Sequence, residues 1–358
     1  MRKAIILAEG YFGTTDGKTA HGLVRYSRKY EILGVIDSTL AGRDAGEVLD
    51  GVKRGIMIYS SLDEALASCP DADTLIIGVA TPGGFLPKEY KDIVKRAIMR
   101  GMNIVSGLHE FLSDDPELSS LARERNVEIV DVRKIFRDMK IFYTGKIDEV
   151  KSLRIAVLGT DSAIGKRTTA IKLVEELNKS GLRAVFVGTG QTAWMQDGRY
   201  GVVIDAMIND FVAGGIEHEI WRAYKEESPD VIVIPGQGSI LHPAFPGSFE
   251  LLAAGKPHAI VLQHAPGRKY LDGFPGYPLP DLDRMIKVIE LLTERKVIAI
   301  TINHENLTRE QVERFIKEYE SRYGVVACDP IWHGVGKIVE RIKEEFPEIG
   351  SKVVARAK

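Results

Sequence analysis

Cysteine is scarce in this chain: only Cys69 and Cys328 occur among its 358 residues. Two cysteines so far apart, neither with a C-x-x-C partner, exclude a disulfide framework and a cysteine zinc site. None of the eight histidines stands in H-x-x-x-H or H-E-x-x-H spacing. The sequence therefore does not predict a dedicated metal site.

A charge excess and a long apolar run are also missing. The 48 basic and 50 acidic residues leave a net charge of −2, which argues against a broad nucleic-acid-binding face. No apolar run reaches the roughly 18 residues of a membrane-spanning helix. The start, MRKAIILAEG, has the pattern of a buried strand rather than of a secretory signal. We therefore expect a cytoplasmic protein that binds neither nucleic acid nor membranes.

Short apolar runs alternate with amphipathic stretches along the whole chain. Strands that are apolar throughout and separated by helices are typical of a parallel sheet covered on both faces. The predicted strands are 4–8, 31–36, 55–58, 74–79, 103–105, 128–130, 154–158, 184–187, 231–234, 259–262, 297–302 and 325–327. The predicted helices are 62–67, 87–100, 116–125, 166–179, 208–226, 281–294 and 308–323.

The length favours two domains, and the basic segment 133–152, which has no clean periodicity, marks their boundary. We predict a Rossmann-like parallel-sheet domain over residues 1–145. A doubly wound α/β domain like that of P-loop NTPases follows over residues 146–358. The first domain lacks the G-x-G-x-x-G fingerprint, and Asp37, after its second strand, either binds a ribose or is simply solvated. Its architecture loosely resembles the CoA-binding domains of acyl-CoA ligases.

The most informative segment is LRIAVLGTDSAIGKRTT, residues 153–169. An apolar strand ends at Gly159, a loop with Gly165 follows, and a helix begins near Lys166. Backbone N–H groups and the positive end of the helix then point into one concavity that fits a phosphate group. The lysine adds a positive charge at the rim of this concavity. An ordinary strand-loop-helix corner is the alternative.

The segment meets the G-x-x-x-x-G-K-[ST] template imperfectly. Thr160 fills the first glycine position, and Arg167 fills the position after the lysine. Thr168 or Thr169 still offers a hydroxyl group to a phosphate oxygen or to Mg²⁺. The residues predicted to bind phosphate are Gly159, Thr160, Asp161, Ser162, Ala163, Ile164, Gly165, Lys166, Arg167, Thr168 and Thr169.

Long polar loops follow the other strands of the second half. In a doubly wound sheet these loops converge on the edge that holds the phosphate loop, and long structured loops there usually carry function. Packing against a partner subunit is the alternative. The candidate bases in these loops are His264, His242 and Asp210, and Arg268 is a candidate for holding substrate carboxylates. The backbone N–H groups of residues 236–239 could stabilise an oxyanion.

The loop GTDSAIGK resembles the G-T-D-[ST]-x-[VI]-G-K loop of dethiobiotin synthetase. With the segments DAMINDFVAG and PGQGSILHP, the complete chain is more similar still to a P-loop family long catalogued as a domain of unknown function. That family includes D-glutamate N-acetyltransferases. The resemblance implies that Asp205 and Asp210 lie near a metal or the substrate amine. It implies a pocket lined by Gly236, Gln237, Gly238, Ser239 and His242.

One departure bears on metal binding. Relatives of dethiobiotin synthetase have a glutamate where this chain has Pro235, and proline cannot bind Mg²⁺. If a Mg-nucleotide binds, Thr168 and Asp205 are the expected metal ligands. Otherwise the loop holds a ligand that needs no catalytic metal.

Three functions remain open. The leading hypothesis is an N-acyltransferase that moves an acetyl group from acetyl-CoA to the amine of an acidic amino acid. The second is an ATP-dependent, Mg²⁺-dependent ligase or kinase, with Asn303 reading adenine by analogy with dethiobiotin synthetase. The third is a nucleotide-binding regulatory module. Aromatic residues in the long loops, such as Phe245 and Tyr270, suit an interface between copies, and they equally suit a lid or the core. We expect a homo-oligomer.

Overall fold

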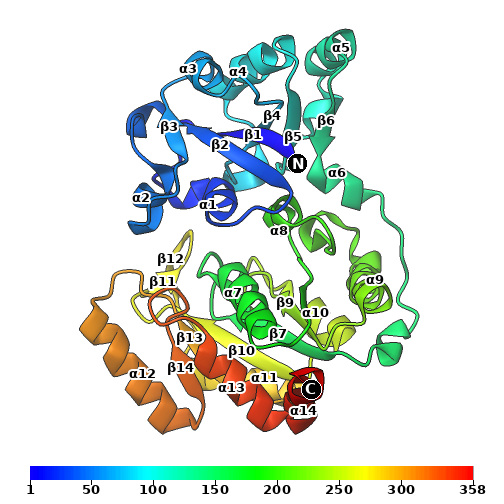
Figure 1. Cartoon of the computed structure of the whole chain (residues 1–358), viewed down its shortest axis with the longest axis vertical. Coiled ribbons are helices and arrows are strands. Elements are labelled where there is room, and N and C mark those ends of the chain that lie inside the picture. The colour runs from blue at the N-terminus through cyan, green and yellow to red at the C-terminus, as the bar shows by residue number, and fades with distance from the viewer. Residues whose placement is uncertain (358) are drawn as a thin grey trace. The chain divides into compact units, whose positions relative to one another are not determined.

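The computed structural model describes the backbone of residues 1–357 and the side chains up to residue 352 (Figure 1). The chain folds into two compact α/β units. One comprises Met1–Met139 and Gln191–Arg199, and the other comprises Lys140–Gly190 and Tyr200–Lys358. This division differs from a single cut after residue 145 in two places. Residues 140–145 belong to the second unit, and residues 191–199 belong to the first.

The first unit contains a six-stranded parallel sheet in the order β3-β2-β1-β4-β5-β6. This order, which reverses direction about β1, is that of a Rossmann-like sheet, as the sequence predicts. Both faces of the sheet are covered, and Ala4 to Leu7 of β1 are therefore 0% exposed. The strands are β1 (Arg2–Leu7), β2 (Tyr30–Ile36), β3 (Met57–Tyr59), β4 (Thr74–Ile77), β5 (Asn103–Ser106) and β6 (Ile129–Asp131).

Helices connect these strands. Tyr90, Val94, Ala97 and Ile98 form the buried face of α4, since each is 0% exposed. Asp37 is also buried, and its two carboxylate oxygens accept the Phe12 and Thr39 amides. The helices are α1 (Lys18–Arg25), α2 (Ala45–Asp50), α3 (Leu62–Ser68), α4 (Lys88–Met99), α5 (Pro116–Arg125) and α6 (Val132–Arg137).

A short helix, α8 (Gln191–Gln196), also belongs to the first unit although the chain around it belongs to the second. The Gln191 side chain donates to Thr19 Oγ1 at 2.8 Å, and the Gln196 side chain donates to the Gly22 carbonyl oxygen at 2.7 Å. These buried amide contacts fix α8 to α1. A six-residue helix is too short for its periodicity to be detected, and the sequence does not predict it.

The second unit contains a six-stranded parallel sheet in the order β14-β13-β10-β7-β9-β8. All seven residues of the central strand β7 are buried. All twelve strands predicted for the two sheets are present. The strands of this sheet are β7 (Leu153–Gly159), β8 (Ala184–Phe186), β9 (Val231–Pro235), β10 (Ala259–His264), β13 (Val297–Ile302) and β14 (Val326–Cys328).

Helices cover both faces of this second sheet, and α7 and α13 lie side by side (Figure 1). The long loops after β9 and β10 contain unpredicted elements, which are α10 and the hairpin of β11 (Tyr270–Leu271) and β12 (Phe274–Pro278). The helices are α7 (Lys166–Lys179), α9 (Asn209–Glu227), α10 (Ser248–Gly255), α11 (Leu282–Thr293), α12 (Arg309–Tyr323), α13 (Gly336–Glu345) and α14 (Pro347–Ala357).

The start of the second unit lies directly on α9. A Cβ atom on Gly214 would come within 1.8 Å of the Ile141 carbonyl oxygen, so only glycine permits this approach. The buried Glu217 carboxylate accepts the Ile147 amide at 3.1 Å. These contacts explain why residues 140–145 belong to the second unit. None of the helices in the described chain has an apolar stretch capable of crossing a membrane.

Candidate functional site

The carboxyl ends of four parallel strands meet at one edge of the second sheet. Gln263 of β10 pairs with Gly159 of β7, His264 pairs with Ile302 of β13, and Pro235 of β9 pairs with Val157. The loops that follow these strands therefore begin side by side, as the sequence predicts for a doubly wound sheet.

The loop after β7, predicted to bind phosphate, leaves open space before the amino end of a helix. Gly165 has φ +101°, in the left-handed region that favours glycine, and a Cβ atom built there would meet only the Gln263 side chain, at 4.0 Å. Within the described residues, no side chain caps the amino end of α7, which begins at Lys166. An uncapped helix end with open space before it suits an anion. The lysine is 7% exposed, and its Nζ donates to the Asp161 carbonyl oxygen at 2.5 Å.

A buried ion pair between Asp161 and Arg268 stabilises this loop. Asp161 is 0% exposed, and its Oδ2 accepts hydrogen bonds from Arg268 Nη1 at 2.8 Å and from the Asp272 amide at 2.9 Å. Its Oδ1 accepts the Ser162 amide at 2.7 Å. A buried charge needs a partner and several hydrogen bonds. The Asp161 side chain, predicted to bind phosphate, is therefore committed to holding the shape of the loop.

Arg268 is positioned by acids of this chain on both sides. Besides Asp161, its guanidinium binds the Ser162 carbonyl oxygen at 3.0 Å and the Glu305 carboxylate at 2.7 Å. The predicted role of Arg268 in holding a substrate carboxylate remains a prediction, and these contacts do not favour it. Through these contacts the guanidinium links the phosphate loop to the loop after β13.

His242 stabilises its own loop. Its Nδ1 accepts the amides of Ala244 and Phe245 at 3.1 and 3.0 Å, so the neutral ring carries its proton on Nε2. Nε2 lies 3.7 Å from Asp161 Oδ1 and is a buried nitrogen without a hydrogen bond in the described chain. Burial lowers the pKa of His242 despite the nearby Asp161 charge. This ring presents a proton rather than a lone pair, which does not favour its predicted role as a base.

His264 lies beneath the phosphate loop. Its Nδ1 is 2.9 Å from Thr160 Oγ1, and its ring meets Tyr319 edge-on. Burial lowers the pKa of His264 to about 4. A general base works best with a pKa near the operating pH, so the predicted catalytic role of His264 also remains a prediction that its surroundings do not favour.

Residues 236–239 form a tight turn after β9. Gly238 has φ +54°, and a Cβ atom there would lie 1.8 Å from the Phe245 carbonyl oxygen. The Gly236 and Ser239 amides donate to the carbonyl oxygens of Val157 and Phe245. Two of the four predicted oxyanion donors are therefore engaged within the fold. The Gln237 side chain points toward the loop after β8, where its Nε2 donates a hydrogen bond to Thr189 Oγ1 at 3.0 Å.

The remaining predicted residues divide between two places. Asn303 joins the phosphate loop, since its Nδ2 donates to the Ile164 carbonyl oxygen at 2.9 Å. Asp205 is exposed on a 3-10 turn next to Ile204, whose amide approaches the Thr189 carbonyl oxygen at 3.4 Å. Asp210 is exposed in the first turn of α9. Asn303 is therefore tied to the phosphate loop, whereas the two aspartates lie on the segment between β8 and β9.

The site also bears on metal binding. Among the described residues, no cluster of three or more His, Cys, Asp or Glu side chains is arranged to hold a metal ion. Thr168 is half-buried near the start of α7. Pro235 replaces the glutamate of the dethiobiotin synthetase pattern. Its carbonyl oxygen accepts a hydrogen bond from the Thr189 hydroxyl at 2.5 Å, which ties the end of β9 to the loop after β8.

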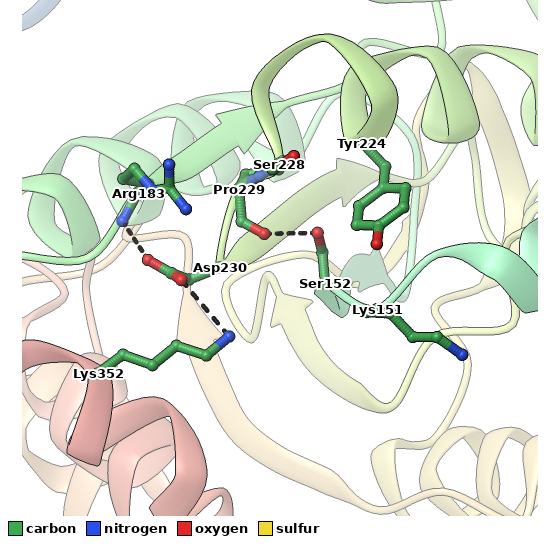
Figure 2. Close-up of a pocket in the computed structure, with 8 residues that line it drawn as sticks. All are labelled: Lys151, Ser152, Arg183, Tyr224, Ser228, Pro229, Asp230 and Lys352. Atoms are coloured by element: carbon green, nitrogen blue, oxygen red, sulfur yellow. Dashed lines mark hydrogen bonds and ion pairs between the residues drawn. The ribbon is translucent and has the colours of Figure 1, made fainter.

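A cavity of about 350 Å³ lies at the opposite edge of the same sheet (Figure 2). Its wall includes Ser152 and Asp230, which immediately precede β7 and β9. Figure 2 shows Asp230 between Arg183 and Lys352, with the Arg183 amide at 2.8 Å and Lys352 Nζ at 3.5 Å. This cavity is at the amino ends of the strands and is separate from the phosphate loop.

One pair of residues at the phosphate-loop edge was not predicted from the sequence. His304 follows β13, Asp329 follows β14, and His304 Nδ1 lies 2.5 Å from Asp329 Oδ2. The two residues are 25 positions apart, and neither belongs to a spaced motif. The adjacency of β13 and β14 was the signal that could have brought them together.

Fold and site together define a two-unit α/β protein that combines a Rossmann-like sheet with a P-loop domain. Residues 38–135 match the Rossmann-like domain of unknown function DUF1611_N, and residues 141–339 match the P-loop domain of unknown function DUF1611_C. The chain belongs to the DUF1611 family. A crystal structure of a DUF1611 family protein from Anabaena variabilis is 30% identical, has a TM-score of 0.89, and matches 96% of this chain and 100% of its own.

Two curated relatives carry a functional name. Proteins from Tritonibacter scottomollicae and from a Pseudoalteromonas species, both named D-glutamate N-acetyltransferase, are each 34% identical to this chain. The first match covers 79% of this chain and 84% of the relative. The second covers 76% and 81%.

Proposed function

We propose that this protein is an N-acetyltransferase that moves the acetyl group of acetyl-CoA to the amine of an acidic amino acid, with D-glutamate as the first candidate. The observation that carries the proposal is the match to two relatives of that name over more than three quarters of the chain. The open amino end of α7 supports it, because acetyl-CoA carries a pyrophosphate and a 3′-phosphate.

The described residues fit a phosphate of acetyl-CoA. The uncapped end of α7 supplies backbone N–H groups, Gly165 leaves space in front of them, and Lys166 supplies a charge. When the phosphate enters, Lys166 Nζ exchanges the Asp161 carbonyl oxygen for a phosphate oxygen. The Arg268–Asp161 ion pair keeps the loop in shape during this exchange.

When bound, acetyl-CoA supplies an activated acetyl group as a thioester. The chain must then hold the amine close to the thioester carbonyl, accept a proton from the ammonium, and provide donors to the developing oxyanion. The Gln237 and Gly238 amides, at the next strand end, are the candidate backbone donors, because the amides of Gly236 and Ser239 are engaged within the fold. Lys269 is exposed beside Arg268 and is a candidate for a substrate carboxylate.

The test is product formation by the purified full chain. Acetyl-CoA is incubated with D-glutamate, L-glutamate, D-aspartate or L-aspartate, and N-acetyl products are measured by mass spectrometry. Parallel reactions contain Mg-ATP in place of acetyl-CoA and are assayed for ADP. Acetylation of an acidic amino acid supports the proposal. ADP release without any acetylation would replace it with the ligase or kinase hypothesis, and ligand binding with neither product would favour a regulatory module.

Lys166→Ala is the binding variant, and Lys179→Ala is its matched control. The first removes the charge at the phosphate loop, whereas Lys179 ends the same helix and its side chain is 72% exposed. We expect acetyl-CoA binding to weaken in the first variant and to be unchanged in the second. Equal binding by both variants would contradict the assignment of the loop to acetyl-CoA.

A further inference from the structure

His304 and Asp329 form a histidine–carboxylate pair directly after β13 and β14, at the edge of the sheet that holds the phosphate loop. His304 Nδ1 lies 2.5 Å from Asp329 Oδ2, and the imidazole is stacked on Trp332 with ring centroids 4.0 Å apart and an interplanar angle of 4°. Asp329 is 1% exposed, and its Oδ1 accepts the amides of Ile331 and Trp332 at 2.7 and 3.0 Å. Carboxylate and stacking together fix the orientation of the imidazole.

This arrangement sets the tautomer of His304. An ionised carboxylate only accepts hydrogen bonds, so Nδ1 of the neutral ring carries the proton and Nε2 carries the lone pair. The His304 side chain is 30% exposed, and Nε2 has no hydrogen bond in the described part of the chain. His242, by contrast, has its proton on Nε2 and is fully buried. His304 is thus oriented to accept a proton from an external group.

The neighbours of His304 in the chain tie it to the phosphate loop. Asn303 donates to the Ile164 carbonyl oxygen of that loop at 2.9 Å. Glu305 binds Arg268 at 2.7 Å, and Arg268 in turn binds Asp161 at 2.8 Å. His304 stands between two residues that are both connected to the loop. A ligand whose phosphate lies at α7 would therefore be close to this part of the edge.

Two features of this pair are unusual for a purely structural contact. The carboxylate is buried and engages three groups, whereas the histidine it holds remains partly open to solvent. The Arg309 guanidinium also lies over the Trp332 ring, 4.9 Å from its centroid. The stack uses burial and aromatic contacts to orient a ring whose second nitrogen is left without a partner in the described residues. This is the geometry expected of an oriented base.

We infer that His304 is the general base that deprotonates the substrate amine and that Asp329 is its positioning residue. This inference rests on the proposed function and names the residue that performs its proton transfer. Nε2 takes one proton from the substrate ammonium. The amine nitrogen then attacks the thioester carbonyl carbon, the C–N bond forms, and the C–S bond breaks. The CoA thiolate takes the proton from the His304 imidazolium, and the second nitrogen proton is released to water.

The test compares His304→Gln and Asp329→Asn with His218→Gln, a control histidine that is partly exposed beside Glu219 on α9. The amide introduced by Asp329→Asn would keep an oxygen for the two backbone amides and would turn its NH₂ group toward His304 Nδ1. The His304 ring would then carry its proton on Nε2, and Nε2 would no longer have a lone pair to accept the substrate proton. We expect both site variants to lower kcat by about 10²–10⁴-fold, with the Kd for acetyl-CoA unchanged. The control should retain the wild-type kcat.

A second readout is independent of turnover. Long-range ¹H–¹⁵N spectra of histidine-labelled protein report which ring nitrogen carries the proton. We expect the wild-type protein to show His304 protonated on Nδ1, and Asp329→Asn to move that proton to Nε2. His304→Gln identifies the signal, and retention of all other histidine signals shows that the variants are folded.

The outcomes separate this inference from the proposed function. A wild-type protein that acetylates no amine overturns the proposed function and the inference together. Wild-type acetylation with an unchanged kcat in His304→Gln overturns the inference alone. A His304 ring protonated on Nε2 in the wild-type protein also overturns it. Loss of kcat in both variants, with the tautomer change in Asp329→Asn, supports it.

Discussion

Replacement of Arg268 by alanine tests the buried ion pair beneath the phosphate loop. The guanidinium binds two carboxylates that differ sharply in exposure: the side chains of Asp161 and Glu305 are 0% and 40% exposed. Arg268→Ala would leave the Asp161 carboxylate with the backbone amides of Ser162 and Asp272 but without a cation. Removing one partner of a buried pair costs about 3–5 kcal/mol of unfolding free energy.

Glu305→Ala is the matched control. It removes the carboxylate on the exposed side of the same guanidinium and leaves the buried pair intact. An exposed ion pair is worth at most about 1 kcal/mol. The two variants should therefore differ in unfolding free energy by at least about 2 kcal/mol, although each breaks an ion pair with the same arginine.

The measurement is urea unfolding followed by tryptophan fluorescence in a Trp194→Phe background. Trp194 belongs to the first unit, and the other tryptophans, Trp221 and Trp332, belong to the second. The signal then reports only the unit that contains the phosphate loop. Equal losses in the two variants, or a loss below about 1 kcal/mol for Arg268→Ala, would refute the view that Asp161 depends on its cation.

Three further predictions concern the same unit. Lys166→Ala should raise the Kd for acetyl-CoA by about 10- to 100-fold in calorimetric titration, because a charge-assisted hydrogen bond is worth about 1.5–3 kcal/mol; an unchanged Kd would contradict this. Gly238→Ala should lower the unfolding free energy by more than about 2 kcal/mol, since the new Cβ would meet the Phe245 carbonyl oxygen. Gly273→Ala, at φ +73° with nothing within 4 Å, should cost only about 1 kcal/mol, and equal costs would rule out the steric explanation. The pKa of His264 is lowered to about 4 in the folded protein, below the unfolded value of about 6.5. The unfolded state therefore binds the proton more strongly, and we expect this ring to lower the unfolding free energy by about 3 kcal/mol as the pH drops from about 6.5 to about 4. His264→Gln should show a shallower fall in urea titrations, and an identical profile would show that this ring does not titrate on unfolding.

The sheets were predictable from the sequence because their strands are buried on both faces. Continuous apolar runs such as 231–234 and 297–302 have few alternatives when turns bound them and helices separate them. The phosphate loop was predictable for a related reason, since its glycine and lysine directly join a buried strand to a helix. Local sequence was enough wherever neighbouring residues made the feature.

The parts that were not predicted depend on contacts between distant residues. Helix α8 is fixed by Gln191 and Gln196, whose partners lie more than 170 positions away. The interaction of Asp161 with Arg268 likewise spans 107 positions. The sequence therefore suggested that Arg268 binds a substrate carboxylate, because it did not reveal that the arginine binds Asp161. The same holds for His304, which acquires its orientation from the Asp329 carboxylate directly after the next strand. Side-chain chemistry suggested candidates, but only the packing of the loops assigned their partners.

A crystal structure of the full chain with acetyl-CoA would show whether the amides at the start of α7 bind a phosphate group of the substrate. We expect a phosphate group of the ligand within hydrogen-bond distance of backbone N–H groups between residues 163 and 168, with Lys166 Nζ moved from the Asp161 carbonyl oxygen to a phosphate oxygen. Acetyl-CoA ordered elsewhere on the protein, with Lys166 still bound to Asp161, would contradict it.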